Sequence, residues 1–143
     1  LKLIDTFNIK DYISFAGEVP RNNLVHFYNV ADVVLNPSNP HPLLWKEQVG
    51  MVVLEALAMG KSVIGSANGG HYEFGNLPNL FFSPPCSYLE LFNAMKLIYF
   101  FYKEYHTNST TKNITKKIMK DYCAVDNICI KLRNYYEEVL NGN

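Results

Sequence analysis

Short apolar runs that alternate with helical patterns are the feature of this 143-residue sequence that most restricts its fold. The runs read "YISFAG", "DVVLNPS", "SVIGS" and "NLFFSPP", and each is closed by glycine, serine or proline. Between them, apolar residues recur at helical spacing, as in "RNNLVHFYNVA" and "VGMVVLEALAMG". Repeated strand–helix alternation predicts an α/β domain in which helices cover a parallel sheet.

The helical segments carry their own boundary signals. Gly60 is predicted to close the helix that begins near Gly50, because glycine adopts the left-handed conformation common after a helix. Ser87, with Glu90 three positions later, predicts the start of a long helix from residue 87 to about residue 106. Two further helical patterns, around residues 114–122 and 125–140, finish the chain.

Composition excludes several classes of function. Thirteen basic and thirteen acidic residues give no net charge, which argues against nucleic acid as a partner held by bulk electrostatics. Three cysteines without metal-binding spacing predict free thiols in a reducing compartment. The N-terminal residues lack the pattern of a signal peptide, and no apolar run is long enough to span a bilayer. We therefore expect a single cytoplasmic domain over residues 1–143.

In a parallel sheet, ligands bind beyond the carboxyl ends of the strands. Four segments are predicted to share that edge: Gly17–Pro20, Asn36–Glu47, Gly65–Glu73 and Ser83–Pro85. Gly69 and Gly70 permit a close approach of the backbone to a ligand, although a tight turn alone also explains them. His71 is either a donor to phosphate or a loop histidine without a role. Lys46 and Lys61 are either cations near the site or solvated side chains.

The stretch "KEQVGMVVLEALAMGKSVIG" places one carboxylate on each side of a helix start. No strong capping side chain precedes the helix at Gly50, so its first amides are left for an outside acceptor such as phosphate. Glu55 would then point back toward that end, and Glu47 would precede it. Carboxylates suit paired sugar hydroxyls, so the pattern fits a nucleotide sugar. Chance spacing of two surface glutamates is the alternative.

The wider sequence resembles the C-terminal, donor-binding half of family 4 retaining glycosyltransferases, which have the GT-B fold of two Rossmann-like halves. The resemblance covers about the first two-thirds of the chain. It rests on spaced motif positions, which are Phe15, Gly17, Val19, Ala31, Asp32, Pro37, Ser38, Glu47, Gly50, Glu55, Ala56, Ala58, Gly60, Val63, Ile64, Gly69, Gly70 and Glu73.

The resemblance implies a role for each matching position. Glu47 would be the catalytic residue that contacts the transferred sugar, and Gln48, Val49 and Gly50 would bring backbone amides near that sugar. Met51 and Val52 would offer amides to the diphosphate, and Glu55 would bind the ribose hydroxyls. Gly17, Glu18 and Val19 would line the base pocket. Ser38, Gly69, Gly70 and His71 complete the candidate rim. Members of the family need no metal or other cofactor, and this sequence has no D-x-D pair.

Some family features are absent from these residues. The family's "GFG" is "QVG" here, so an aromatic side chain next to the sugar is missing. The first strand of the donor half, with its Arg and Lys, and the whole acceptor-binding half do not occur. We therefore expect a domain truncated at its N-terminus and inactive alone. A glycan or lipid-linked acceptor would bind through the missing half.

Other interpretations remain open at this point. The chain is alternatively a non-catalytic nucleotide-sugar-binding or assembly module of a split glycosyltransferase, or, with less support, a nucleotide-sugar epimerase. The lysine cluster of residues 112–120 is either a peripheral membrane contact or a solvated helix face.

Overall fold

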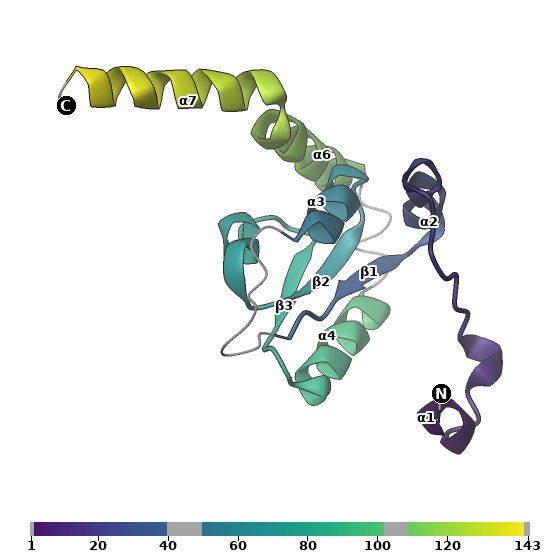
Figure 1. Ribbon diagram of the computed structural model, residues 1–143. Coiled ribbons are helices and arrows are strands. Elements are labelled where there is room, and N and C mark those ends of the chain that lie inside the picture. Colours follow the sequence, from purple (N-terminus) through teal and green to yellow (C-terminus); the bar gives the residue numbers. More distant parts are fainter. Residues whose placement is uncertain (1, 40–49, 102–108, 142–143) are drawn as a thin grey trace.

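The computed structural model describes residues 2–39, 50–101 and 109–141. Twelve elements follow one another along these residues (Figure 1). They are α1 (Lys2–Thr6), η1 (Lys10–Tyr12), η2 (Arg21–Asn23), α2 (Leu24–Val30), β1 (Val33–Asn36), α3 (Met51–Ala58), β2 (Ser62–Ser66), η3 (Gly69–Phe74), β3 (Leu80–Ser83), α4 (Tyr88–Phe100), α6 (Ser109–Cys123) and α7 (Val125–Leu140).

The three strands form one parallel sheet in the order β1-β2-β3. Val33 pairs with Ser62, and Val63 pairs with Leu80, so all three strands run with their carboxyl ends at the same edge. Helices α3 and α6 cover one face and α4 covers the other (Figure 1). All five residues of β2 are buried, as expected for a central strand covered on both sides. The predicted α/β architecture is thereby confirmed.

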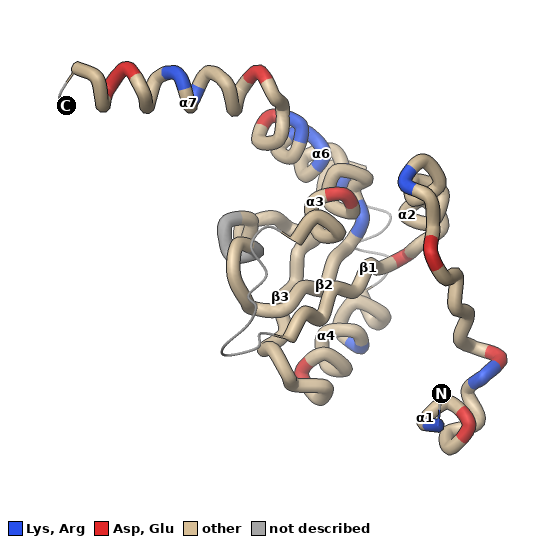
Figure 2. The backbone as a smooth tube through the Cα atoms, viewed as in Figure 1, with Lys and Arg blue, Asp and Glu red and all other residues tan. Residues whose placement is uncertain are grey.

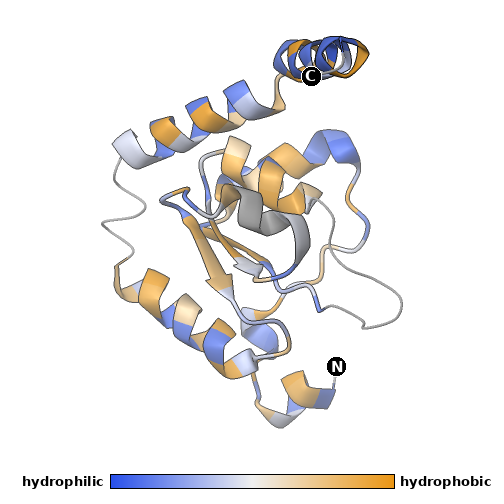
Figure 3. Cartoon of the chain, turned by 90° about the vertical axis from the view of Figure 1, so that its left-hand side faces the viewer, coloured by the Kyte–Doolittle hydropathy of each residue, from blue (hydrophilic) through white to orange (hydrophobic). Residues whose placement is uncertain are grey.

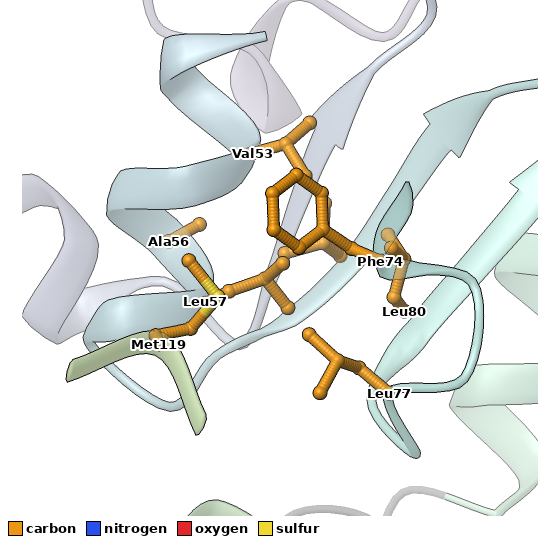
Figure 4. Packing of buried hydrophobic residues seen from close by; sticks show 8 residues of the cluster. Val53, Ala56, Leu57, Phe74, Leu77, Leu80 and Met119 are labelled. Carbon is orange, nitrogen blue, oxygen red and sulfur yellow. The ribbon is translucent and has the colours of Figure 1, made fainter. Parts of the chain in front are cut away.

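The main core lies between α3 and the sheet. Val53, Ala56 and Leu57 of α3 are completely buried (Figure 4), and they belong to the same cluster as Val63 of β2. The cluster is completed by Phe74, Leu77, Leu80 and Met119. Figure 3 shows the hydrophobic residues gathered on the strands between the helices. By contrast, α7 extends away from the sheet and has no buried residue. The core therefore fixes α3 more firmly than the C-terminal helix.

Gly60 ends α3 with a left-handed turn. Its φ is +70°, its amide donates to the Leu57 carbonyl at 2.8 Å, and the Lys61 amide donates to the Ala56 carbonyl at 2.9 Å. This pair of bonds is the Schellman arrangement, which satisfies carbonyls that the helix end leaves open. The predicted closure at Gly60 is confirmed, and it turns the chain directly into β2.

A buried polar chain ties α6 to the sheet. The Thr115 hydroxyl donates to Asn79 Oδ1 at 2.6 Å, and Asn79 Nδ2 donates to the Lys61 carbonyl at 2.5 Å. Thr115 is 0% exposed and Asn79 1% exposed, so the Thr115 hydroxyl and Asn79 Oδ1 satisfy each other away from water.

One predicted strand is wrong. Residues 13–17 form no strand, and Phe15 is 74% exposed. A strand requires hydrogen bonds from a neighbour, and among the described residues no strand lies beside this segment. The runs that became β1, β2 and β3 are confirmed, as are the helices α2, α3, α6 and α7. Ser87 accepts from the Glu90 amide at 3.3 Å and confirms the predicted start of α4. The helix ends at Phe100, and the predicted extension reaches residues outside the described ranges.

Replacement of Gly60 by Ala is expected to lower the free energy of unfolding by about 1–2 kcal/mol, because an L side chain is strained at this φ. The added Cβ would also lie 2.7 Å from Lys116 Cε and force that side chain to shift. Gly17→Ala is the matched control, since Gly17 has φ +67° but nothing within 4 Å. Denaturant unfolding should show a larger loss for Gly60→Ala. Equal losses would contradict the account of the helix end.

Replacement of Thr115 by Val is expected to cost about 1–3 kcal/mol, because Asn79 Oδ1 then stays buried without a donor. Thr6→Val is the control. The Thr6 hydroxyl donates to the Lys2 carbonyl at 2.8 Å, but on an exposed helix. Its loss should change the free energy of unfolding by about 0.5 kcal/mol or less. Similar losses of free energy of unfolding in both variants would show that burial does not strengthen the contribution of the Thr115 hydrogen bond.

Candidate functional site at the carboxyl edge of the sheet

The carboxyl edge of the sheet brings together segments that are distant in sequence. β1 ends at Asn36, β2 at Ser66 and β3 at Ser83, and the parallel register places these ends side by side. Ser38 follows β1 and donates from its hydroxyl to Asn36 Oδ1 at 3.3 Å. Gly69, with φ +68°, begins η3 after β2. The remaining predicted segment, Gly17–Pro20, follows no strand and so does not lie at the end of one.

The start of α3 is open, as the sequence predicted. Gly50 is the N-cap, with φ 62° and ψ 63°, and it contributes no side chain to cap the helix. The Gly50 carbonyl accepts from the Val53 and Leu54 amides at 2.8 and 3.1 Å. Helix geometry gives the Met51 and Val52 amides no acceptor within the helix. These amides and the positive end of the helix dipole suit an anion.

Glu55 lies in the second turn of α3 and is half-buried. Its Oε2 accepts a hydrogen bond of 2.7 Å from the hydroxyl of Tyr28 on α2. Burial, the hydrogen bond to Glu55 and the negative charge of Glu55 raise the pKa of Tyr28 to about 12. The carboxylate is therefore held by a neutral donor, and its second oxygen can accept from a ligand hydroxyl.

Two hollows meet at Glu55. The larger, of about 710 Å³, is mostly apolar. It is lined by Met51, Leu54, Glu55, Ala58, Gly70, Phe74, Tyr122, Cys123, Ile128, Lys131 and Leu132. The smaller, of about 280 Å³, lies between α2 and α3 and is lined by Arg21, Leu24, Val25, Tyr28, Glu55, Ala58 and Met59. Among the described residues, Glu55 is the one acidic side chain that lines these two hollows.

A third hollow, of about 310 Å³, opens where the strands meet the start of α4. Its lining comprises Pro37, Asn39, Ser66, Ser83, Pro84, Cys86, Ser87, Tyr88 and Leu91. Ser66 and Ser83 belong to two of the predicted edge segments, although the sequence analysis gave neither serine a role of its own. Sequence reasoning missed Tyr28, whose partner is 27 positions away.

The structure gathers only part of the predicted site. Glu47, Gln48 and Val49 lie outside the described residues, and so does the side chain of His71. Gly50, Met51, Val52 and Glu55 share one helix, and Gly70 lies across the larger hollow. Gly17, Glu18 and Val19 line none of these three hollows. These role assignments stay predictions.

Three lysines lie at the opposite end of α3, namely Lys61, Lys112 and Lys116. A Cβ on Gly60 would meet Lys112 and Lys116, and Lys61 Nζ donates to the Asn29 carbonyl at 2.9 Å. Burial and the charge of Lys112 lower the pKa of Lys61. Figure 2 shows these cations on α6 and at the end of α3. Lys61, one of the two candidate cations, therefore lies away from the open helix start.

Within the described ranges, no cluster of three or more His, Cys, Asp or Glu side chains has the arrangement of a metal site. Over the same residues, no helix combines the length and hydrophobicity needed to cross a membrane.

The parallel sheet with helices on both faces defines an α/β domain, a class of fold in which ligands bind beyond the carboxyl ends of the strands. Residues 1–85 match the family described as Glycosyl transferases group 1, and the chain belongs to this family. Two curated relatives are similar over part of the chain. A D-inositol 3-phosphate glycosyltransferase of Frankia alni is 36% identical over 70 residues, which are 49% of this chain and 16% of that protein. A lipopolysaccharide 1,2-N-acetylglucosaminetransferase of Salmonella typhimurium is 39% identical over 64 residues, or 45% and 15%.

Two solved structures share the fold over 99% of this chain. Sucrose-phosphate synthase from Thermosynechococcus elongatus superposes with a TM-score of 0.73 at 24% identity, and this chain covers 34% of it. HepE of Anabaena, solved in complex with UDP, gives a TM-score of 0.74 at 20% identity and 35% coverage. At these identities the likenesses show the fold alone, and they support the expected GT-B fold. The chain thus spans about a third of the length of these proteins.

The hydrogen bond between Tyr28 and Glu55 predicts a distinct titration. Tyr28 should ionise near pH 12, above its ordinary value of 10.0. Because folding favours the protonated form, this contribution to the free energy of unfolding is fully present below pH 10 and lost as the pH rises toward 12. Tyrosine labelled at Cζ would report the pKa by NMR, with Tyr28→Phe to assign the signal.

Glu55→Gln removes the charge and should lower the pKa of Tyr28 without restoring the ordinary value, because burial is the largest cause. Glu90→Gln on α4 is the control and should leave the pKa of Tyr28 unchanged. A Tyr28 signal that titrates together with the exposed tyrosines would refute the hydrogen bond.

Proposed function

We propose that this chain is the donor-binding part of a family 4 retaining glycosyltransferase. In this proposal it binds a nucleotide-diphosphate sugar and presents the sugar to a hydroxyl of a glycan or lipid-linked acceptor. The observation that carries the proposal is the uncapped start of α3 at Gly50, with the half-buried carboxylate of Glu55 one turn further on. Membership of the glycosyltransferase family supplies the class of reaction.

The diphosphate is assigned to the start of α3. Gly50 is buried and has no side chain, so a phosphate oxygen can approach the Met51 and Val52 amides closely. An acidic side chain in the first turn of α3 would repel the phosphate, and the described first turn contains none. The charge pattern therefore favours an anion at the helix start and a hydroxylated group beside Glu55.

The ribose is assigned to Glu55. An ionised carboxylate only accepts hydrogen bonds, and the two adjacent ribose hydroxyls are donors. The Tyr28 hydroxyl occupies Oε2, which leaves lone pairs of the carboxylate for a ligand. HepE of Anabaena, which shares the fold, was solved in complex with UDP, and UDP contains the diphosphate and ribose that this proposal requires. Glu47 is proposed to contact the sugar, and no metal or cofactor is invoked.

The acceptor is proposed only by chemical class. One relative is named for inositol phosphate and another for lipopolysaccharide, and both of these acceptor types carry hydroxyl groups. We propose reaction in the cytoplasm, with contact to a membrane surface where the acceptor is lipid-linked.

Calorimetric titration with UDP, GDP and ADP, on the protein at its full natural length, tests the donor site. One of these nucleotides should bind, and Glu55→Ala should weaken it about tenfold to a hundredfold, as expected for loss of a hydrogen bond to a charged group. Glu90→Ala is the control, because Glu90 lies in the first turn of α4, over the other face of the sheet. Failure of all three nucleotides to bind a folded sample, or an equal loss in the Glu90 variant, would reject the proposal.

A further inference from the structure

We infer that Tyr28 is a positioning residue, which holds the Glu55 carboxylate in the orientation that accepts from a ribose hydroxyl. This inference rests on the proposed function, since it presumes that Glu55 meets the ribose. The contact that carries it is the 2.7 Å hydrogen bond from the Tyr28 hydroxyl to Glu55 Oε2, which joins α2 to α3. Tyr28 itself is not proposed to contact the nucleotide sugar.

The ring of Tyr28 is fixed by packing. Tyr28 is half-buried and packs against the cluster formed by α3, β2 and their neighbours. A tyrosine side chain has only two rotatable torsions, so a packed ring places its hydroxyl within a small volume. The hydroxyl therefore acts as a rigid donor at the wall between the two hollows that Glu55 lines.

Glu55 needs such a partner because its own side chain is flexible. A glutamate has three torsions, and a ligand that must immobilise it loses affinity for the entropy involved. Among the described residues, Tyr28 is the one side chain that forms a hydrogen bond with the Glu55 carboxylate. The hydrogen bond from Tyr28 to one carboxylate oxygen orients the other oxygen. The Glu55 side chain is therefore already ordered when the nucleotide binds.

The Tyr28 hydroxyl also keeps one protonation state. A tyrosine with the ordinary pKa of 10.0 is already protonated at neutral pH, and burial with the contact to Glu55 raises the pKa of Tyr28 to about 12. The hydroxyl therefore keeps its proton well into the alkaline range. A phenol that lost its proton would repel the carboxylate. The pair therefore keeps a single geometry under the conditions in which a glycosyltransferase operates.

A purely structural role is the competing explanation, because the same bond links α2 to α3. The two explanations differ in what they predict for nucleotides that lack ribose hydroxyls. A positioning role affects only ligands that use Glu55, whereas a structural role affects every ligand of the site alike.

The test compares Tyr28→Phe with the unchanged protein at its full natural length. Tyr28→Phe removes the hydroxyl and keeps the packed ring. Calorimetry would measure Kd for the nucleoside diphosphate that binds best among UDP, GDP and ADP, and for its 2′-deoxy and 3′-deoxy forms. The unchanged protein should prefer the ribose form, and Tyr28→Phe should reduce that preference by about threefold to tenfold, as expected for one hydrogen bond. Affinity for the deoxy form that lacks the hydroxyl bound by Glu55 should stay the same.

Two controls accompany the measurement. Tyr99→Phe alters an exposed tyrosine near the end of α4, which lines none of the three hollows, and should leave the ribose preference unchanged. In a Glu55→Ala background, Tyr28→Phe should have no further effect, because the residue through which it acts is gone. Thermal unfolding of each variant establishes that the comparison is made between folded proteins.

The outcomes separate this inference from the proposed function. If the unchanged protein binds ribose and deoxyribose nucleotides equally, the assignment of Glu55 to the ribose fails, and the inference fails with it. If the preference exists and Tyr28→Phe retains it in full, only the inference is overturned. Equal weakening of all ligands by Tyr28→Phe would show a structural role and would also overturn it.

Discussion

The packing of α3 against β2 is the interaction on which the rest of the structure depends. Val53, Ala56 and Leu57 are wholly buried over the sheet, and burial of side chains of this kind stabilises by about 1.5–3 kcal/mol for each large residue. This contact fixes the helix along its length and about its axis. Because Glu55 lies between those buried residues in sequence, its position beside the two hollows is set by the same core rather than by a mobile loop.

Glycine ends α3 on both sides, and the two glycines have different consequences. Gly60, with φ +70°, turns the chain back into β2 and satisfies the last carbonyls through the Schellman bonds. Gly50, with φ 62°, begins the helix without a side chain that could occupy the first amides. The helix is therefore closed at the end that faces its own sheet and open at the end that faces the ligand edge.

The fold was largely predictable because each predicted strand and helix that the structure confirms carries a local sequence signal. The periodicity of α3, the capping serine of α4 and the buried run of β2 act over a few residues. The run at residues 13–17 has the same local signal, but a strand also needs a neighbour, which no local pattern reveals. For the same reason the sequence indicated Glu55 but not Tyr28. Their contact joins positions 27 apart, and it exists only after both helices pack on the sheet.

The distribution of charge sets a limit on what the described residues can do alone. Lys112, Lys116 and Lys61 surround the Gly60 end of α3, whereas the diphosphate is proposed at Gly50. Eight helical residues span about 12 Å, which exceeds the screening length of about 8 Å at physiological salt. Screening therefore weakens the attraction between these lysines and a diphosphate at the helix start. Amides and the helix dipole supply only partial charge there. Lys131 of α7 lines the larger hollow together with Met51. Among the described cations that line the three hollows, Lys131 is therefore the one placed to add positive charge beside the helix start.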